Sequence, residues 1–202
     1  MPALSLLTIA GAGLWVALVV TAQLLTPGQS AVHMGMSGLA TGRYGWLMKL
    51  AFVVRGLTTL ALVAAVAGGV PAAAVSLPGL VLFAAWGGGS ALLACYDTDV
   101  PGHKPTRRGQ AHALIALIAY VAAVAGMILM SLQLRHDGAL AGVARWALLI
   151  ALVAAVAMLA QLAGFAAAAR LPAHGLGRYA GLLQRVFLAL VMLWTVVVAA
   201  GI

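Results

Sequence analysis

Long, uninterrupted apolar runs constrain this sequence more than any other feature. Each run is about 20 residues long, which is the length that an α-helix needs to cross the hydrocarbon core of a bilayer. A membrane-spanning β-strand would instead alternate polar and apolar residues over about ten positions. We therefore predict an all-α, polytopic membrane helix bundle with about six transmembrane helices. The predicted spans are Leu4–Leu25, Trp46–Ala67, Ser76–Cys95, His112–Leu132, Trp146–Ala169 and Leu182–Ile202.

The composition agrees with a lipid environment. Apolar residues make up 65% of the 202 residues and charged residues only 7%, whereas a soluble domain carries roughly 25% charged residues. We expect residues 1–202 to form a single transmembrane domain. The first apolar run has no basic region before it and no clean cleavage signal after it, so we expect a retained helix rather than a signal peptide.

Lys and Arg residues are divided unequally between the two ends of the predicted helices. The net charge is +8, but the cations stand singly between apolar runs, so we expect no nucleic-acid partner. Because short loops rich in Lys and Arg stay in the cytoplasm, we expect a cell-membrane protein with both termini outside. The cation-rich side carries Arg43, Lys49, Lys104, Arg107, Arg108, Arg170, Arg178 and Arg185, and the other side carries Arg135 and Arg145.

A short repeat suggests that the bundle consists of three related helical hairpins. Gly42-Arg43-Tyr44 opens the second predicted helix and Gly177-Arg178-Tyr179 precedes the sixth, with Phe52 and Phe187 following at the same offset. Chance similarity between Leu-rich helices is the alternative explanation. We keep the three repeated hairpins as a hypothesis.

Three stretches of the sequence resemble motifs of the family called domain of unknown function 998. They are residues 37–49, the loop 96–102 continued by 106–112, and residues 181–185, which end in Arg185. The resemblance covers nearly the whole chain with the motifs in order. It implies an integral membrane protein of six helices without an established activity.

The central loop departs from the pattern of that family. The resemblance places the family's aspartate on Asp99, and proline is usual at the position of Asp97. It places the second of two family histidines on His112, while Arg108 stands where the first is usual. These departures weaken any hypothesis that needs a pair of histidines.

Arg55 is the most informative single residue. It lies about nine residues inside the second predicted helix, roughly 14 Å from its start at 1.5 Å per residue. An arginine at this depth costs at least about 2.5–3.5 kcal/mol and usually faces a partner or a wet cavity. Either Arg55 anchors an anionic group, such as a lipid phosphate or carboxylate, or it pairs structurally with an Asp or with backbone carbonyls.

The loop before the fourth predicted helix gathers a second group of polar residues, Asp97, Asp99, His103 and His112. Asp and His side chains can bind a metal or exchange protons, but the spacing fits neither a metal site nor a haem, so we expect no metal and no cofactor. The structural interpretation is that Asp99 caps the loop and bonds His112 or Arg107. We expect His112 in the first helical turn, facing the cytoplasmic interface.

Two further segments have structural interpretations. Gly87-Gly88-Gly89-Ser90 lies inside an apolar run, where small residues let helices approach closely. The polar segment Thr26–Tyr44 is expected to be either a short amphipathic helix at the interface or a lid over the cytoplasmic face.

Two functions remain open. The first is binding or sensing of a lipid or amphiphile at the cytoplasmic face, with Arg55 as the anchor and membrane lipid as the partner. The alternative is a membrane-embedded enzyme or small transporter that uses Asp99 and His112, and we favour it less. A closed bundle would be monomeric, whereas helices rich in small residues would also suit a homo-oligomer.

Overall fold

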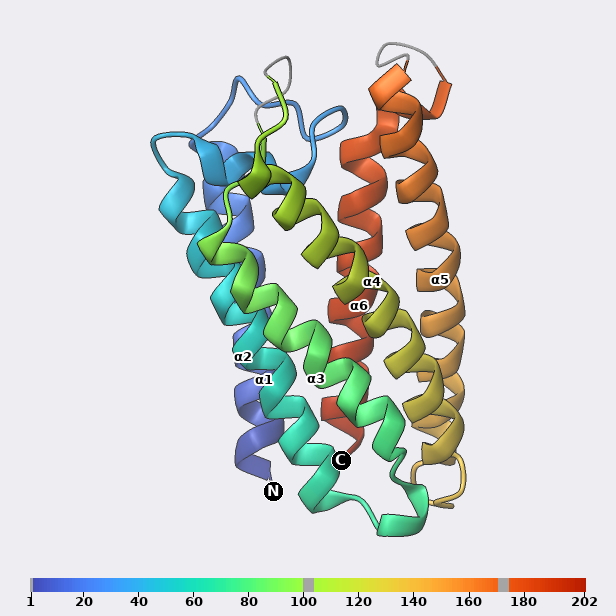
Figure 1. Cartoon of the computed structure of the whole chain (residues 1–202). Helices are drawn as coiled ribbons and strands as arrows, with labels where there is room; N and C mark the ends of the chain where they lie inside the picture. Colours follow the sequence, from blue (N-terminus) through green and yellow to red (C-terminus); the bar gives the residue numbers. More distant parts are fainter. Residues whose placement is uncertain (1, 100–103, 171–174) are drawn as a thin grey trace.

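The computed structural model describes residues 2–99, 104–170 and 175–202, and every regular element in these residues is a helix. Six of the helices are long and apolar enough to cross a membrane, which confirms the predicted all-α, multi-pass architecture (Figure 1). The long helices are α1 (Pro2–Leu24), α2 (Gly45–Gly69), α3 (Leu77–Leu92), α4 (Arg107–Leu134), α5 (Ala141–Arg170) and α6 (Ala180–Gly201). Helix α3 reaches a spanning length with the 3-10 turn that continues it to Cys95. Short 3-10 turns complete the fold: η1 (Met36–Thr41), η2 (Ala72–Ala74), η3 (Leu93–Cys95) and η4 (Gly175–Tyr179).

Helices α4 and α5 begin earlier than the sequence predicted. The apolar runs start at His112 and Trp146, but the helices start at Arg107 and Ala141, because hydropathy marks the part of a helix that lies in lipid and not its polar end. At the start of α4 the hydroxyl of Thr106 accepts a hydrogen bond from the Gly109 amide at 3.0 Å, a typical N-cap. His112 therefore lies in the second turn of α4, and its predicted place in the first turn was wrong.

The helices pair most extensively with their sequence neighbours, α1 with α2, α3 with α4 and α5 with α6. Helix α1 also contacts α6 and so closes the bundle. The starts of α2 and α6 resemble each other: Tyr44 (φ −99°, ψ 18°) and Tyr179 (φ −109°, ψ 8°) hold the N-cap positions, and each ring carries the guanidinium of the preceding arginine. This pairing fits three hairpins, and their origin as repeats stays a prediction.

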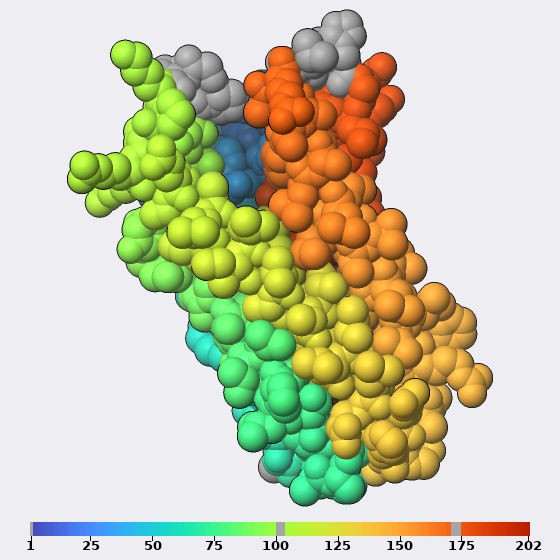
Figure 2. Space-filling model, turned by 45° about the vertical axis from the view of Figure 1, so that its right-hand side comes forward, coloured from blue at the N-terminus to red at the C-terminus, as the bar shows by residue number. Residues whose placement is uncertain are grey.

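Both termini lie at one end of the bundle (Figure 1). We call this the terminal end, and we call the opposite end, where α1–α2, α3–α4 and α5–α6 are connected, the loop end. Figure 2 shows that the loop end is hollowed between α4 and α5, with the blue N-terminal part of the chain visible between them. The cation-rich connections thus share one end, as the charge pattern predicted.

Helices α2 and α3 approach closely where two glycines meet. A Cβ on Gly56 would lie 2.6 Å from the carbonyl oxygen of Gly87, and a Cβ on Gly87 would lie 3.1 Å from that of Gly56. The neighbouring Gly88 faces open space, and α3 remains helical through all three glycines. The packing role expected for this stretch is therefore confirmed for Gly87.

Candidate functional site

Arg55 lies in the interior of the bundle, with only 1% of its surface exposed. Its Nε donates a hydrogen bond to Ser90 Oγ at 2.5 Å, and Ser90 Oγ donates to the carbonyl oxygen of Phe52 at 3.4 Å. The guanidinium carbon lies 4.6 Å from the centre of the Trp86 ring and 5.5 Å from that of the Phe52 ring. Arg55 thus faces aromatic rings and one hydroxyl rather than lipid.

The glycine contact between α2 and α3 positions this pair. Gly56 follows Arg55 directly, and Ser90 lies about one turn beyond Gly87. Because the two backbones touch at these glycines, the short side chain of Ser90 reaches the guanidinium of Arg55. A Cβ at Gly87 would lie 3.1 Å from the Gly56 carbonyl oxygen and from Thr59 and would push α2 and α3 apart by a few tenths of an ångström, which strains the contact between Arg55 and Ser90.

No carboxylate balances the charge of Arg55 in the part of the chain that the structure describes. The chain contains only three acidic residues, and all of them lie within the described ranges. Each is engaged elsewhere: Asp97 pairs with Lys49, Asp99 bonds Thr106, and Asp137 accepts hydrogen bonds from the amides of Ala139 and Leu140. An aspartate partner for Arg55, one form of the structural pairing considered from the sequence, is therefore not found among the described residues.

One nitrogen of the guanidinium, Arg55 Nη1, is buried without a hydrogen-bond partner among the described residues. Arg55 also lines an enclosed cavity of about 10 Å³. A cavity of this size has room for about one water molecule. The polar part of its lining comes from Arg55, Ser37, His112, Tyr120 and Gln184.

His112 is buried on the same cavity, with 4% of its surface exposed. Its Nδ1 lies 2.8 Å from the carbonyl oxygen of Tyr96. A carbonyl oxygen only accepts hydrogen bonds, so Nδ1 carries a proton, and in the neutral form of the ring Nε2 keeps its lone pair. The centre of its ring lies 6.0 Å from the centre of the Phe52 ring. His112 therefore belongs to the interior and not to the interface, contrary to the sequence prediction.

Gln184 links three parts of the site. Its Nε2 donates to Tyr120 Oη at 3.0 Å, and its Oε1 accepts from the backbone amide of Met36 at 2.6 Å. It therefore joins α6 to α4 and to η1. Sequence reasoning did not single out Ser90, Tyr120 or Gln184 as site residues, although each is a polar side chain in an otherwise apolar span.

Residues 25–44, which we call the connector, form the roof of this cavity. The connector consists of turns and η1, not of an amphipathic α-helix, and Met36 and Ser37 line the cavity from above. Arg185 holds the connector to α6, since its Nη1 donates to the carbonyls of Ala31 and Met34 at 2.8 and 2.9 Å. The lid interpretation of this segment is thus the one that the structure supports, and Arg185 acts as its anchor.

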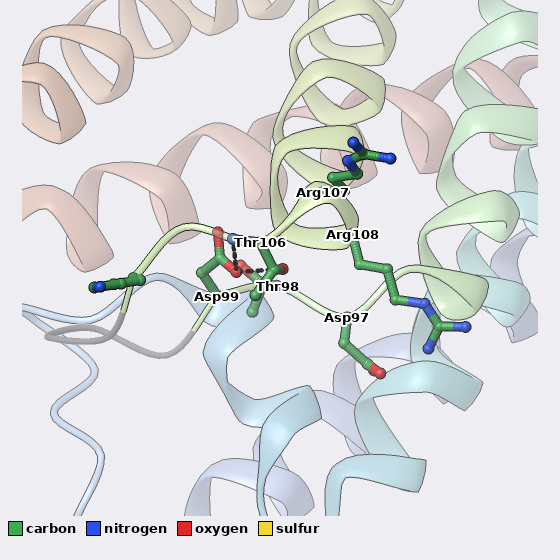
Figure 3. A pocket seen from close by; sticks show the side chains of 7 residues that line it. Asp97, Thr98, Asp99, Thr106, Arg107 and Arg108 are labelled. Carbon is green, nitrogen blue, oxygen red and sulfur yellow. Dashed lines mark hydrogen bonds between the residues drawn. The ribbon is translucent and has the colours of Figure 1, made fainter.

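Asp97, Asp99 and Arg108 lie outside the cavity, in an open hollow of about 430 Å³ at the loop end (Figure 3). Asp99 Oδ1 accepts from the amide of Thr106 at 3.1 Å and from its hydroxyl at 2.7 Å. Asp99 therefore caps the loop as predicted, but its partner is Thr106 rather than His112 or Arg107. Figure 3 shows the side chains of Arg107 and Arg108 extending away from Asp99.

The candidate residues thus divide into two groups. Arg55 and His112 share the buried cavity, whereas Asp99 and Arg108 lie in the surface hollow. His103 lies outside the described residues. Within the described ranges, no three His, Cys, Asp or Glu side chains lie together in the way that a metal site requires.

Comparison with known proteins agrees with the sequence motifs. The model of a family described as "Protein of unknown function (DUF998)" matches residues 9–201, nearly the whole chain. No curated protein and no solved structure matches the chain.

Proposed function

Because this chain belongs to the DUF998 family, whose description names no activity, we propose a function from the site itself: binding of a lipid or amphiphile whose anionic head contacts Arg55. The protein resides in the cell membrane with its loop end in the cytoplasm. The head group therefore lies on the cytoplasmic side of the bilayer. The proposal involves no catalysis.

The observation that carries the proposal is a buried cation without a matching anion. Insertion of an arginine near mid-bilayer costs at least about 2.5–3.5 kcal/mol. Cation–π contacts of the kind made with Trp86 and Phe52 return about 0.5–2 kcal/mol each, which offsets much of that cost. They leave the Nη1 hydrogens of Arg55 without an acceptor, and a carboxylate or phosphate oxygen supplies one.

The connector supports access to this site. The cavity itself is too small for a head group, so binding requires the roof over Arg55 to move. The connector has only turns and η1 as regular structure, and the amide of Met36 in its roof is held by the side chain of Gln184. A roof of this kind opens at lower free energy than a transmembrane helix.

The alternative, an enzyme or transporter that uses Asp99 and His112 together, lacks comparable support. Asp99 is engaged by Thr106, and His112 by the carbonyl of Tyr96. The two side chains line different spaces, so they offer no acid–base pair to a single substrate.

Native mass spectrometry of the gently extracted protein tests the proposal. We expect the wild-type protein to retain an anionic lipid or amphiphile that Arg55→Met loses, because methionine fills the space without the charge. Arg55→Lys should retain part of it, since lysine keeps the charge but not the planar fork. Arg145→Met, which removes an exposed arginine at the terminal end, is the matched control. An unchanged lipid profile in a monodisperse Arg55→Met preparation would contradict the proposal.

A further inference from the structure

A continuous apolar groove runs along the seam between α1 and α6. It consists of two adjoining hollows of about 390 Å³ each, which share Trp15, Val16 and Ala189. From Ile9 to Gln23 the groove follows α1 for about 21 Å at 1.5 Å per residue. Helices α1 and α6 contact each other less extensively than any two long helices that follow one another in the chain.

The groove changes character at the loop end. Its walls are apolar along most of α1, but its upper part is bordered by Gln23 and Arg185. The hydrogen bonds of the Arg185 guanidinium go to backbone carbonyls and to Gln23 Oε1. These acceptors are neutral, so the positive charge of Arg185 is not balanced by them. A molecule with an apolar chain and an anionic head matches this distribution: the apolar walls suit its chain, and Arg185 attracts its head toward the loop end.

Met36 separates the groove from the buried arginine. Its side chain lines the upper hollow of the groove and also the cavity that contains Arg55. Met36 is itself buried, and a methionine side chain is unbranched and adapts readily to its surroundings. Met36 borders both spaces, so a route from the groove to Arg55 passes its side chain.

We propose that the groove holds the chain of a single-chain amphiphile with a carboxylate head, which enters sideways from the membrane and passes Met36 to reach Arg55. This inference rests on the proposed function and specifies its ligand and its route. The small cavity favours a carboxylate over a glycerophosphate, because the smaller head displaces less of the roof. A carboxylate also matches the planar fork of a guanidinium.

Photo-crosslinking of the purified full-length protein tests the groove. The probe is palmitic acid with a diazirine in its chain, and the crosslinked residues are located by mass spectrometry. We expect labels on α1 and α6. Ala189→Phe fills the groove and should lower the labelling about tenfold, which corresponds to about 1.4 kcal/mol. Ala85→Phe, an equally exposed change on α3, is the matched control and should label like wild type.

A second arm separates this inference from the proposed function. Wild type should be crosslinked more strongly by the diazirine acid than by the corresponding diazirine alcohol, and Arg55→Met should be crosslinked equally by both. If Ala189→Phe is labelled as strongly as wild type, the proposal that the groove binds the chain is overturned, whatever the result for Arg55→Met. If Arg55→Met still prefers the acid, the head does not bind at Arg55, and the proposed function and the route past Met36 are overturned.

Discussion

Arg55 has an environment that suits a ligand anchor better than a structural ion pair. Its contacts are two aromatic rings and the hydroxyl of Ser90, and none of them is an anion. A structural arginine would be expected to gain stability from a carboxylate, which the described residues do not place near it. The effect of Arg55 on the stability of the fold can therefore be measured separately from its effect on ligand binding.

Thermal unfolding in detergent distinguishes the two roles of Arg55. Replacement of a buried ion pair by apolar residues of similar size is often neutral or stabilising, and the destabilising case is one in which a charged partner is left behind. Arg55 has no carboxylate partner among the described residues, so its removal strands no charge. We expect Arg55→Met to keep or raise the Tm, since a gain of about 1 kcal/mol corresponds to about 2–4 °C in a chain of this size. Ser90→Ala, which leaves the arginine without its hydroxyl partner, should instead lower the Tm. A large loss of Tm in Arg55→Met would indicate a structural role.

At the residue scale, the sequence identified the charged residue inside a span but not the direction in which uncharged polar side chains point. Arg55 was predictable because a charge inside an apolar run is conspicuous whatever its partners are. Ser90, Tyr120 and Gln184 were not predictable as site residues. An uncharged polar side chain can face the lipid or the interior, and the rotation of its helix about its own axis in the bundle decides between the two. His112 was misplaced because the start of α4 depends on the cap at Thr106 rather than on hydropathy.

At the scale of helices, the contact between α2 and α3 carries the site. Gly87 touches α2, whereas Gly88 faces open space on the same helix. Substitutions at the two glycines therefore form a matched pair: each changes helix propensity by the same amount, but only the substitution at Gly87 disturbs packing against α2.

We expect Gly87→Ala to separate α2 from α3 and to lower both the Tm and the retention of lipid. Gly88→Ala should be neutral or slightly stabilising, because alanine favours a helix over glycine by about 1 kcal/mol. Thermal unfolding and native mass spectrometry of the two variants measure the difference. Equal behaviour of the two variants would show that the glycine contact does not position Ser90.

The six spans could be predicted from the sequence because each needs only its own apolar residues. The connector could not, since its conformation depends on distant partners. Met36 bonds Gln184, and Arg185 bonds Ala31 and Met34, and no local pattern records these contacts. The sequence therefore left a lid and an interfacial helix as equal alternatives.

For the whole molecule, the charge asymmetry predicts an orientation that labelling can check. In a Cys95→Ser background, a single cysteine is placed at Gly42 on the loop end or at Gly138 on the terminal end. Neither glycine has an atom within 4 Å of an added Cβ, so both substitutions should fold. We expect an impermeant thiol reagent to label Gly138→Cys in intact cells and Gly42→Cys only after permeabilisation. The reverse pattern would place the loop end outside.

The hydrogen bond between Met36 and Gln184 joins residues that are 148 positions apart in the chain. At a synthesis rate of about 5–20 residues per second, the second partner leaves the ribosome about 7–30 s after the first. Until then the connector over Arg55 lacks its partner on the last helix. A chain that terminates before that helix would have neither Gln184 nor Arg185 to hold the connector, so its roof would be present but unanchored.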